Sequence, residues 1–475
     1  MGRGEYGKAF AHKFAGFLSG ERPTARPFLH QTGCQKATYK GFEAKPDTKI
    51  GTQNFAVKTY FKEPLFTYVF LYSIIHVSRI VNRLDWQFVE VCPVLDVDVL
   101  VVGGGPAGSS LGYMLQQNNI RSCIVEKQAF PRAKLCGGLL TEKTVELINK
   151  TYDQMDFPCE RITSNLNLHI GTHCFSSITA DSKFYLVERM AFDNWLIKKY
   201  KEAGGLLFEN ASITSIDLHE KIAVIGEGSE IRFKILVGAD GANSKIRKYL
   251  DKKYHPNALC LEYDLPGSPT NDSINIYFSA IRSGYGWCFP KQNHTTVGIG
   301  GAIEANRDMK TLFRSFAKSI GKEAEESKIK GALIPFGKYV KNPCGNNIIL
   351  IGDAAGFVDP ITGEGIYFAI YSAKCAFEAV NSYLHQGTEL DSAYLEKIRY
   401  IQKRIDDGNR FSRSIFFRDL TRPFFINLID GRKNISRYVC DHLIAHYNVS
   451  YSHLVIEYYR VRRQRKANEK RQRAR

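Results

Sequence analysis

The sequence predicts an α/β fold with three parts: a nucleotide-binding domain assembled from separated segments, a second domain built on a β-sheet, and a helical C-terminal region. Three observations support this prediction. A glycine-rich loop joins an apolar strand to a helix at 103–108, two further strand-and-loop segments with aspartate follow much later, and turn-bounded apolar segments lie between them. At 475 residues and 44% hydrophobic content, the chain is long enough for two or three structural units around sizeable cores.

The glycine-rich loop lies within VDVLVVGGGPAGSSLGYMLQQNNIRSCIVEK. The apolar pattern predicts a strand over 97–102, a helix that continues to about Gln117 and a second strand over 122–125. The N-terminus of that helix offers oriented N–H groups to phosphates. Glu126 closes the second strand, eighteen residues past Gly108, where its carboxylate is placed to accept a hydrogen bond from a ribose hydroxyl.

Three glycines give the loop the spacing GxGxxG. Gly103 allows the tight turn, Gly105 lets the backbone approach a pyrophosphate, and Gly108 lets the helix pack on the strand. Because this spacing stands between a strand and a helix, with a carboxylate at the right distance, it predicts a dinucleotide site. The motif alone does not separate FAD from NAD.

Two later segments favour FAD. FKILVGADGANSKIRKYL predicts a strand over 235–237 that ends at Asp240 and Gly241, and NNIILIGDAAGFVDPITGEGIYFAI predicts a strand, a loop and a helix that begins near Gly365. Asp353, at the carboxyl end of that strand, is placed to bond a ribityl hydroxyl. The positive end of the helix would face the N1 and C2 carbonyl region of a flavin, which carries negative charge when it is reduced.

The chain resembles the geranylgeranyl reductase family of para-hydroxybenzoate-hydroxylase-like FAD-dependent oxidoreductases over about residues 96–385. The dinucleotide loop, the GADG segment and GDAAGFVDPITGEGI match the wider superfamily. PRAKLCGG (131–138), YGWCFP (285–290) and GALIP (331–335) match the reductase branch. Arg189, in VERMAFDNWL, matches a superfamily arginine near the adenosine side of FAD.

The resemblance implies a Rossmann-type FAD-binding domain that is discontinuous along the chain. It assigns FAD contacts to Gly103, Gly105, Ala107, Gly108, Glu126, Lys127, Cys136, Gly137, Gly138, Arg189, Asp240, Gly241, Gly352, Asp353, Pro360, Gly363, Gly365 and Ile366. We expect an N-terminal extension of unassigned structure at 1–95, the FAD-binding domain at 96–165, 184–255 and 336–385, the substrate and catalytic domain at 166–183 and 256–335, a helical region at 386–459, and a basic disordered tail at 460–475.

Cys136 is the first candidate catalytic residue. The 11 cysteines are an odd number with no CxxC or CxxH pair, which disfavours a disulfide framework and a metal site and favours a reducing compartment. Gly137 and Gly138 suit close backbone approach to a flat ligand, and the resemblance places this segment beside the isoalloxazine ring. Arg132 and Lys134 would favour the thiolate if they approach it. We interpret Cys136 as a proton relay to the substrate; a buried core thiol is the alternative.

Tyr285 and Trp287 are the other candidate catalytic residues. With Phe289 they stand at alternate positions of a predicted strand, so the three side chains share one face. This face is interpreted as the wall of a tunnel for an apolar chain; an ordinary aromatic core stripe is the alternative.

The predicted activity is reduction of C=C bonds of an isoprenoid, geranylgeranyl-type lipid, with hydride from flavin N5 and a proton from a nearby donor. Because no second dinucleotide loop occurs, the external reductant would dock transiently, as NAD(P)H or a small electron carrier. The alternative activity is FAD-dependent monooxygenation of an aromatic or polyketide-like compound. A halogenase is disfavoured by Tyr285, where halogenases usually have tryptophan, and a non-catalytic flavin-binding or membrane-docking protein is a third class.

The net charge of +17 is concentrated at the C-terminus, where 460–475 holds nine Lys/Arg against one Glu. This tail would be attracted to an anionic membrane surface, or would be a solvated end; nucleic acid is disfavoured because no aromatic residue interleaves the charges. The fifteen uncharged residues 64–78 are shorter than the ~20 that a membrane span needs, and 415–429 carries clustered apolar side chains. We therefore predict a cytoplasmic protein that is peripheral on a membrane, with no metal; the sequence does not indicate the oligomeric state.

Overall fold

A computed structural model describes residues 94–153, 156–412 and 433–453, together with 456, 460 and 463. The chain divides into two units, Met1–Val94 and Leu95–Arg475, and the fold described below belongs to the second. The predicted apolar segments at 64–78 and 415–429, and the tail from residue 464 onward, lie outside the described residues.

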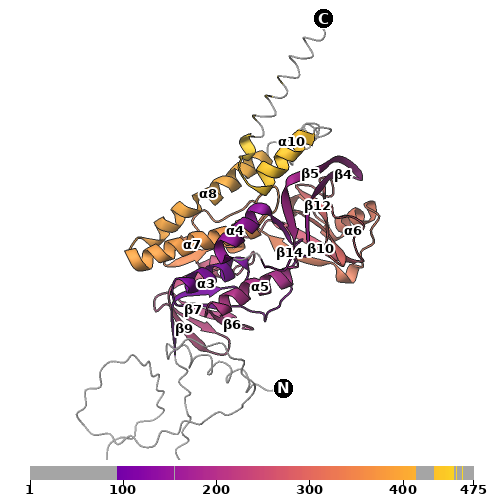
Figure 1. Cartoon of the computed structure of the whole chain (residues 1–475). Helices are drawn as coiled ribbons and strands as arrows, with labels where there is room; N and C mark the ends of the chain where they lie inside the picture. Colours follow the sequence, from indigo (N-terminus) through magenta and orange to yellow (C-terminus); the bar gives the residue numbers. More distant parts are fainter. Residues whose placement is uncertain are drawn as a thin grey trace, which may run out of the picture. The chain divides into compact units, whose positions relative to one another are not determined.

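The first sheet is mostly parallel. Its strands are β1 (Leu95–Val102), β2 (Ser122–Val125), β6 (Leu206–Phe208), β7 (Ile213–Asp217), β8 (Ile222–Ile225), β9 (Ser229–Gly238), β15 (Cys344–Gly345) and β16 (Ile348–Leu350). The order is β15-β16-β9-β1-β2-β6, and β7 and β8 extend antiparallel from β9 (Figure 1). β1 pairs in parallel with both β2 and β9, so the strand that leads into the glycine-rich loop lies inside the sheet.

Three helices pack side by side against this sheet. They are α3 (Pro106–Gln117), α5 (Arg189–Glu202) and α7 (Ile366–Gln386), and α7 also contacts α4 (Glu142–Tyr152) and α8 (Leu390–Phe411). Two glycines let α3 approach closely. A Cβ on Gly108 would lie 1.9 Å from the Gly103 carbonyl oxygen, and one on Gly112 would lie 2.8 Å from the Tyr200 ring. The close packing of helix on strand predicted for Gly108 is therefore present.

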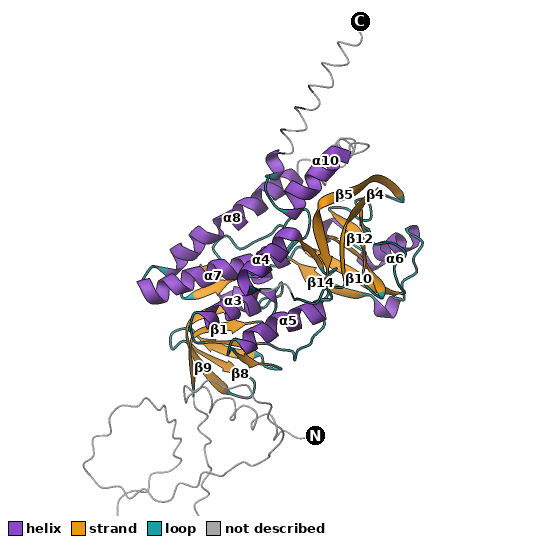
Figure 2. Ribbon diagram, in the orientation of Figure 1, coloured by secondary structure: helices purple, strands orange, loops and turns teal. Residues whose placement is uncertain are grey.

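The second sheet is almost entirely antiparallel. Its strands are β3 (Leu139–Thr141), β4 (Arg161–Ile170), β5 (His173–Leu186), β10 (Ala258–Pro266), β11 (Ile274–Tyr277), β12 (Gly284–Pro290), β13 (His294–Ala302) and β14 (Lys330–Ile334). The order is β14-β10-β13-β12-β11-β4-β5-β3, and the one parallel pair in it is β11 with β4. Figure 2 shows the two sheets as separate groups of strands.

The two faces of the second sheet carry different cores. Helix α6 (Met309–Ser319) covers one face and packs Phe313 and Phe316 against Val297 and Ile299. The other face buries Trp287 and Phe289 in a separate cluster. Because both faces are covered, a polar side chain in the middle of this sheet is enclosed by protein.

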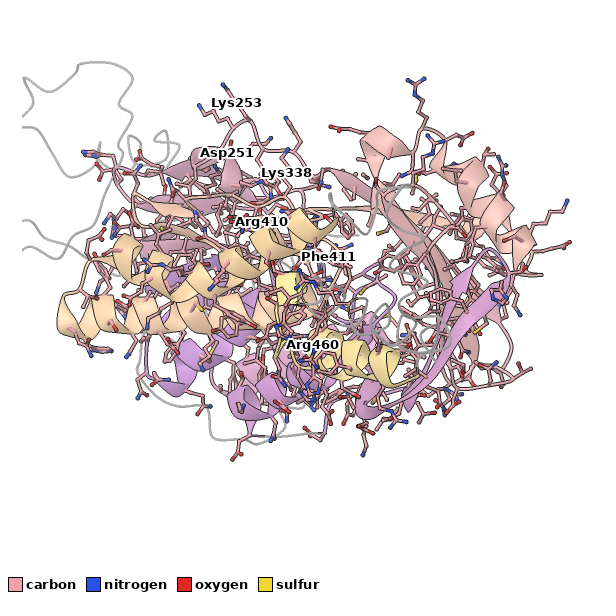
Figure 3. The ribbon with its side chains drawn as sticks, turned by 90° about the horizontal axis from the view of Figure 1, so that it is seen from above. Asp251, Lys253, Lys338, Arg410, Phe411 and Arg460 are labelled. Carbon is pink, nitrogen blue, oxygen red and sulfur yellow. The ribbon has the colours of Figure 1, made fainter. Side chains whose placement is uncertain are left out.

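The C-terminal region is helical, as predicted. After α8 the described chain resumes as α10 (Lys433–Tyr438) and the π-helix η6 (Val439–Ala445), both of which contact β5. Figure 3 shows Arg410 and Phe411 at the end of α8, and the Phe411 ring stacks on Tyr451 with 5.6 Å between ring centroids. None of the helices in the described ranges is long and apolar enough to cross a membrane. The predicted fold class is thus confirmed.

Candidate active site

A cavity of about 710 Å³ is lined by residues of both sheets. This volume is within the ~300–1,000 Å³ typical of small-molecule and cofactor sites. Most of the residues predicted from the sequence line it: Gly103, Gly105, Ala107, Glu126, Lys127, Cys136, Gly137, Gly138, Arg189, Asp240, Gly241, Tyr285, Trp287, Asp353, Gly363, Gly365 and Ile366. Segments from separated parts of the chain therefore converge on one space.

Three of the predicted residues do not line the cavity. Gly108 lies in the contact between α3 and the glycine-rich loop. The Gly352 N–H donates to Ser372 Oγ at 2.9 Å. Pro360 packs against Gly337 and Gly408, so that a Cβ on either glycine would lie 2.6 Å from its ring. Pro360 thus packs against Gly408 of helix α8 and is not among the residues that line the cavity.

The glycine-rich loop is tightly packed at Gly103 and open at Gly105. Gly103 has φ +106°, and a Cβ there would lie 2.4 Å from the Ala239 carbonyl oxygen. Gly105, in contrast, has no neighbour nearer than Arg132 Nη2 at 3.6 Å. Helix α3 begins after Gly105 without a side-chain cap. Since the first N–H groups of a helix lack intrahelical partners, this end offers donors to an anionic group in the cavity.

A row of alternating charges runs from this loop toward Cys136. Glu126 Oε2 accepts from the Gly104 N–H at 2.9 Å and lies 3.6 Å from Arg132 Nε. Arg132 Nη1 lies 3.3 Å from Asp193 Oδ2, and Asp193 Oδ1 accepts from Arg189 Nε at 2.8 Å. All four charged side chains are almost fully buried. The row fixes Arg132 at the point where the glycine-rich loop is open.

Arg189 is the basic group whose charge acts on the Cys136 thiol. Both residues line the cavity and interact electrostatically, and the Gly138 N–H donates to Cys136 Sγ at 3.4 Å. The sequence suggested Arg132 and Lys134 for this role, but Arg132 is paired with carboxylates. The sequence also associated Arg189 with the adenosine side of FAD, which stays a prediction.

The glycines after Cys136 are required by protein neighbours. A Cβ on Gly137 would lie 2.7 Å from the Phe289 ring, and one on Gly138, which has φ +70°, would lie 2.0 Å from the Val187 carbonyl oxygen. These contacts require glycine at both positions, while the expectation that the two glycines also admit a flat ligand stays a prediction. They let the loop that carries Cys136 lie directly on the second sheet.

The aromatic residues of β12 form one wall of the cavity. Ring centroids are 5.7 Å apart for Tyr285 and Trp287 and 6.2 Å apart for Trp287 and Phe289. The neighbouring β13 has glycine beneath the indole, and a Cβ on Gly298 would lie 2.3 Å from it. Tyr285 OH donates to the Thr362 carbonyl oxygen, which ties this wall to the loop before α7. The wall is both packed on the sheet and open to the cavity.

Two partly buried aspartates line the cavity. Asp240 Oδ2 accepts from the Lys245 N–H at 2.6 Å, while its Oδ1 is buried without a partner among the described residues. Burial raises the pKa of Asp353, although the charges of Lys134, Arg189 and Arg247 oppose the shift. The Asp240 carboxyl thus has unsatisfied hydrogen-bonding capacity toward the cavity.

Sequence reasoning missed several buried charges around the cavity. Glu262 in β10 is 6% exposed, Lys291 after β12 is 1% exposed, and Lys143 pairs with Glu364. Glu262 offered a signal, because it is an acidic residue among apolar neighbours in ALCLEYDLP. The pairing of Lys143 with Glu364 joins positions far apart in the chain and had no local signal.

The site fits FAD on its own geometry. The open position at Gly105 and the uncapped end of α3 suit a pyrophosphate. In the part of the chain that the structure describes, Asp240 Oδ1 and the buried Trp287 Nε1 have no hydrogen-bond partner, and both suit a polar ligand. Among the described residues no group of His, Cys, Asp or Glu could hold a metal ion, and the nine described cysteines are free.

Comparison with known proteins agrees with this fit. The FAD binding domain family matches residues 96–265. An uncharacterized protein of Methanosarcina barkeri is 31% identical over 352 residues, covering 70% of this chain and 86% of its own. Geranylgeranyl diphosphate reductase of Rhodobacter capsulatus is 27% identical over 62% of this chain and 77% of its own, and digeranylgeranylglycerophospholipid reductase 1 of Methanopyrus kandleri is 28% identical over 60% and 80%.

Solved structures share the fold. A geranylgeranyl bacteriochlorophyll reductase-like protein of Thermoplasma acidophilum superposes with a TM-score of 0.65 at 20% identity, covering 74% of this chain and 97% of its own. PqsL of Pseudomonas aeruginosa, a probable FAD-dependent monooxygenase, superposes with a TM-score of 0.57 at 20% identity, covering 70% and 99%. At these identities the likeness establishes the fold alone.

Proposed function

This chain belongs to the geranylgeranyl reductase family of FAD-dependent oxidoreductases, and we propose that it reduces carbon–carbon double bonds of an isoprenoid lipid of geranylgeranyl type. The observation that carries the proposal is one cavity in which the FAD motifs of the first sheet meet the aromatic wall of the second, beside the Cys136 thiol. The first sheet would bind the cofactor and the second sheet the substrate.

The cofactor-binding residues follow from the cavity. We assign the pyrophosphate to the end of α3 at Gly105, the adenosine ribose to Glu126, the ribityl chain to Asp353 and the flavin ring to the start of α7 at Gly365. FAD, when bound and reduced, supplies the hydride.

The chain's own residues would supply water exclusion and the proton. An unactivated alkene requires a dry, apolar site, which Tyr285, Trp287 and Phe289 provide on one side of the cavity. We assign proton donation to Cys136. The positive charge of Arg189, which acts on the sulfur, would stabilise the thiolate that remains after the proton leaves.

The external reductant is proposed to be NAD(P)H or a small electron carrier that docks transiently. The sequence has one dinucleotide loop, and the assignment above gives that loop to FAD. Anaerobic mixing of the FAD-loaded protein with NADH, NADPH or reduced ferredoxin, followed by flavin absorbance, would identify the donor.

The activity is tested by product analysis. FAD-loaded protein, reduced under argon, is incubated with geranylgeranyl diphosphate or with a geranylgeranylated glycerophospholipid, and the lipids are examined by mass spectrometry. Each reduced bond adds two hydrogen atoms without dioxygen. A product that forms only in air and carries an added oxygen atom would instead support the monooxygenase alternative.

We also propose that the protein works on the cytoplasmic surface of a membrane, as a peripheral protein. The basic tail at 460–475 and the apolar segments at 64–78 and 415–429 support this. Deletion of 460–475 should weaken sedimentation with anionic vesicles, and moderate salt should have the same effect on the full chain. Binding that survives both treatments would assign the anchor to the apolar segments.

A further inference from the structure

Glu262 is a carboxylic acid that lines the cavity from the middle of β10, the strand next to the edge strand β14 of the second sheet. It is 6% exposed. In the sheet register it stands opposite Gly298 of β13, and Gly298 in turn stands opposite Trp287 of β12. Residues in one row of a sheet point to the same face, so Glu262 and Trp287 project toward the same side. That side is the cavity wall.

The Glu262 carboxyl lies beside Cys136. Both residues line the cavity, and a Cβ on Gly137, next to Cys136, would lie 3.2 Å from Nε1 of Trp287 in the same row of the sheet as Glu262. Glu262 forms no salt bridge within the described ranges. The buried cation Lys291 is engaged elsewhere. Lys291 Nζ donates to the Val187 carbonyl oxygen at 2.6 Å and lies 3.7 Å from Glu188 Oε1. Glu262 is thus enclosed without a counter-ion of its own.

The ionisable groups near Glu262 belong to β10, β14, α5 and the residue after β12. Burial and the neighbouring Asp264 on β10 raise the pKa of Glu262 to about 8, although Lys291, Arg189 and the Cys136 N–H oppose the shift. Cys260 on β10 and Lys330 on β14, which is in register with Glu262, complete the set. At neutral pH the carboxyl therefore holds its proton.

We propose that Glu262 holds the proton that returns Cys136 to the thiol form after each alkene reduction. The inference rests on the proposed function and adds a second proton-holding group to it. One alkene carbon accepts the hydride that reduced FAD supplies, and the other accepts the thiol proton of Cys136, which leaves a thiolate. The Glu262 carboxyl then gives its proton to that sulfur and becomes a carboxylate, which solvent reprotonates.

The proton coupling is tested first without substrate. Alkylation of Cys136 by iodoacetamide is followed against pH in the FAD-loaded protein by mass spectrometry of its peptide. In the wild type, ionisation of Glu262 adds a second step to the curve and opposes the thiolate; in Glu262→Gln that step is absent and the midpoint moves to lower pH. Asp264→Asn, two residues away on the same strand, keeps both steps. A wild-type curve in Glu262→Gln would overturn the proposal.

The pH dependence of repeated turnover is tested second. Wild-type alkene reduction falls as the pH rises through about 8. Glu262→Gln lowers the turnover rate at least ~tenfold and removes this fall, with flavin content and flavin reduction unchanged. Asp264→Asn shifts the fall to lower pH, because one charge that raises the pKa of Glu262 is gone. Loss of flavin in Glu262→Gln, or an unchanged pH profile, would return Glu262 to a structural role.

The two tests separate this inference from the proposed function. If the alkylation curves show the coupling but no isoprenoid is reduced with any donor, the proposed activity fails while the coupled thiol and carboxyl stand. If isoprenoids are reduced and the curves show no coupling, the activity stands and Glu262 has no part in it.

Discussion

Lys143 Nζ lies 2.7 Å from Glu364 Oε2, and both side chains are almost fully buried. The pair joins α4 to the loop that opens α7, where the flavin ring is proposed to lie. Thr141 Oγ1 and Tyr447 OH each donate to Glu364 at 2.6 Å, and the Lys143 ammonium stacks over the Tyr447 ring at 3.7 Å. Burial acts to raise the pKa of Glu364, but Lys143 and these hydrogen bonds outweigh it and hold the pKa below its ordinary value.

Removing one partner of this pair should destabilise the fold. Glu364→Ala leaves the Lys143 ammonium buried without its counter-charge, and breaking a buried ion pair in this way costs about 3–5 kcal/mol. We expect a loss of this size in the free energy of unfolding, measured by urea denaturation with FAD in excess. The Lys143→Met, Glu364→Gln double variant should lose less than the sum of the two single changes. Additive losses would show that the pair does not interact.

Three glycines of the dinucleotide loop should respond differently to substitution. Gly103→Ala and Gly108→Ala place a Cβ 2.4 Å and 1.9 Å from backbone oxygens, so both should lower the melting temperature of the apoprotein. Gly105→Val projects into open space beside Arg132 and should leave that temperature nearly unchanged while flavin occupancy falls, because it obstructs the pyrophosphate. Full occupancy in Gly105→Val would contradict the cofactor placement.

Substitution of Cys136 should lower alkene reduction without changing FAD binding or flavin reduction. Cys136→Ser and Cys136→Ala should retain FAD and its reduction but lose alkene reduction, by about a hundredfold or more for a missing proton donor. The Cys136→Ser variant should retain little alkene reduction, since a hydroxyl is a far weaker acid than a thiol. Flavin content, flavin reduction and lipid product are measured separately. Equal loss of flavin in both variants would instead favour the buried core thiol.

Local sequence was sufficient for the dinucleotide unit. The strand over 122–125 and the helix ending at Gln117 have the predicted limits, because the turn glycines and the apolar period act within a few residues. Local sequence was insufficient to predict contacts between residues that are far apart in the chain. Arg189 acts on Cys136 only because α5 and the loop before β3 converge, and no spacing encodes that approach.

Gly137 carries a constraint that the local sequence did not indicate. Besides the predicted approach to a ligand, which stays a prediction, a Cβ there would lie 2.7 Å from the Phe289 ring on a strand far along the chain. Glu262 is a second such case. An acidic residue in a strand is commonly solvent-facing, and only the coverage of both sheet faces makes this one buried.

Glu262 should also impose a pH dependence on stability. Its folded-state pKa is about 8, against an ordinary value of 4.5, so between these limits the folded protein keeps a proton that the unfolded chain loses. The free energy of unfolding therefore falls as the pH rises through this window, by at most about 1.4 kcal/mol per pH unit from this group. In Glu262→Gln the new side chain cannot ionise, so the free energy of unfolding of this variant should not show this fall.

The difference in melting temperature between Glu262→Gln and wild type is the measurement. It should move in favour of the variant from pH 5 to pH 8 and then level off, because above the folded-state pKa both states of the wild type are ionised. Asp264→Asn controls for removal of an acidic group from the same strand; it should keep the fall, which would end at a lower pH because the pKa of Glu262 is lowered. A difference that stays constant from pH 5 to pH 9 would mean that Glu262 is ionised throughout. In that case it holds no proton for Cys136.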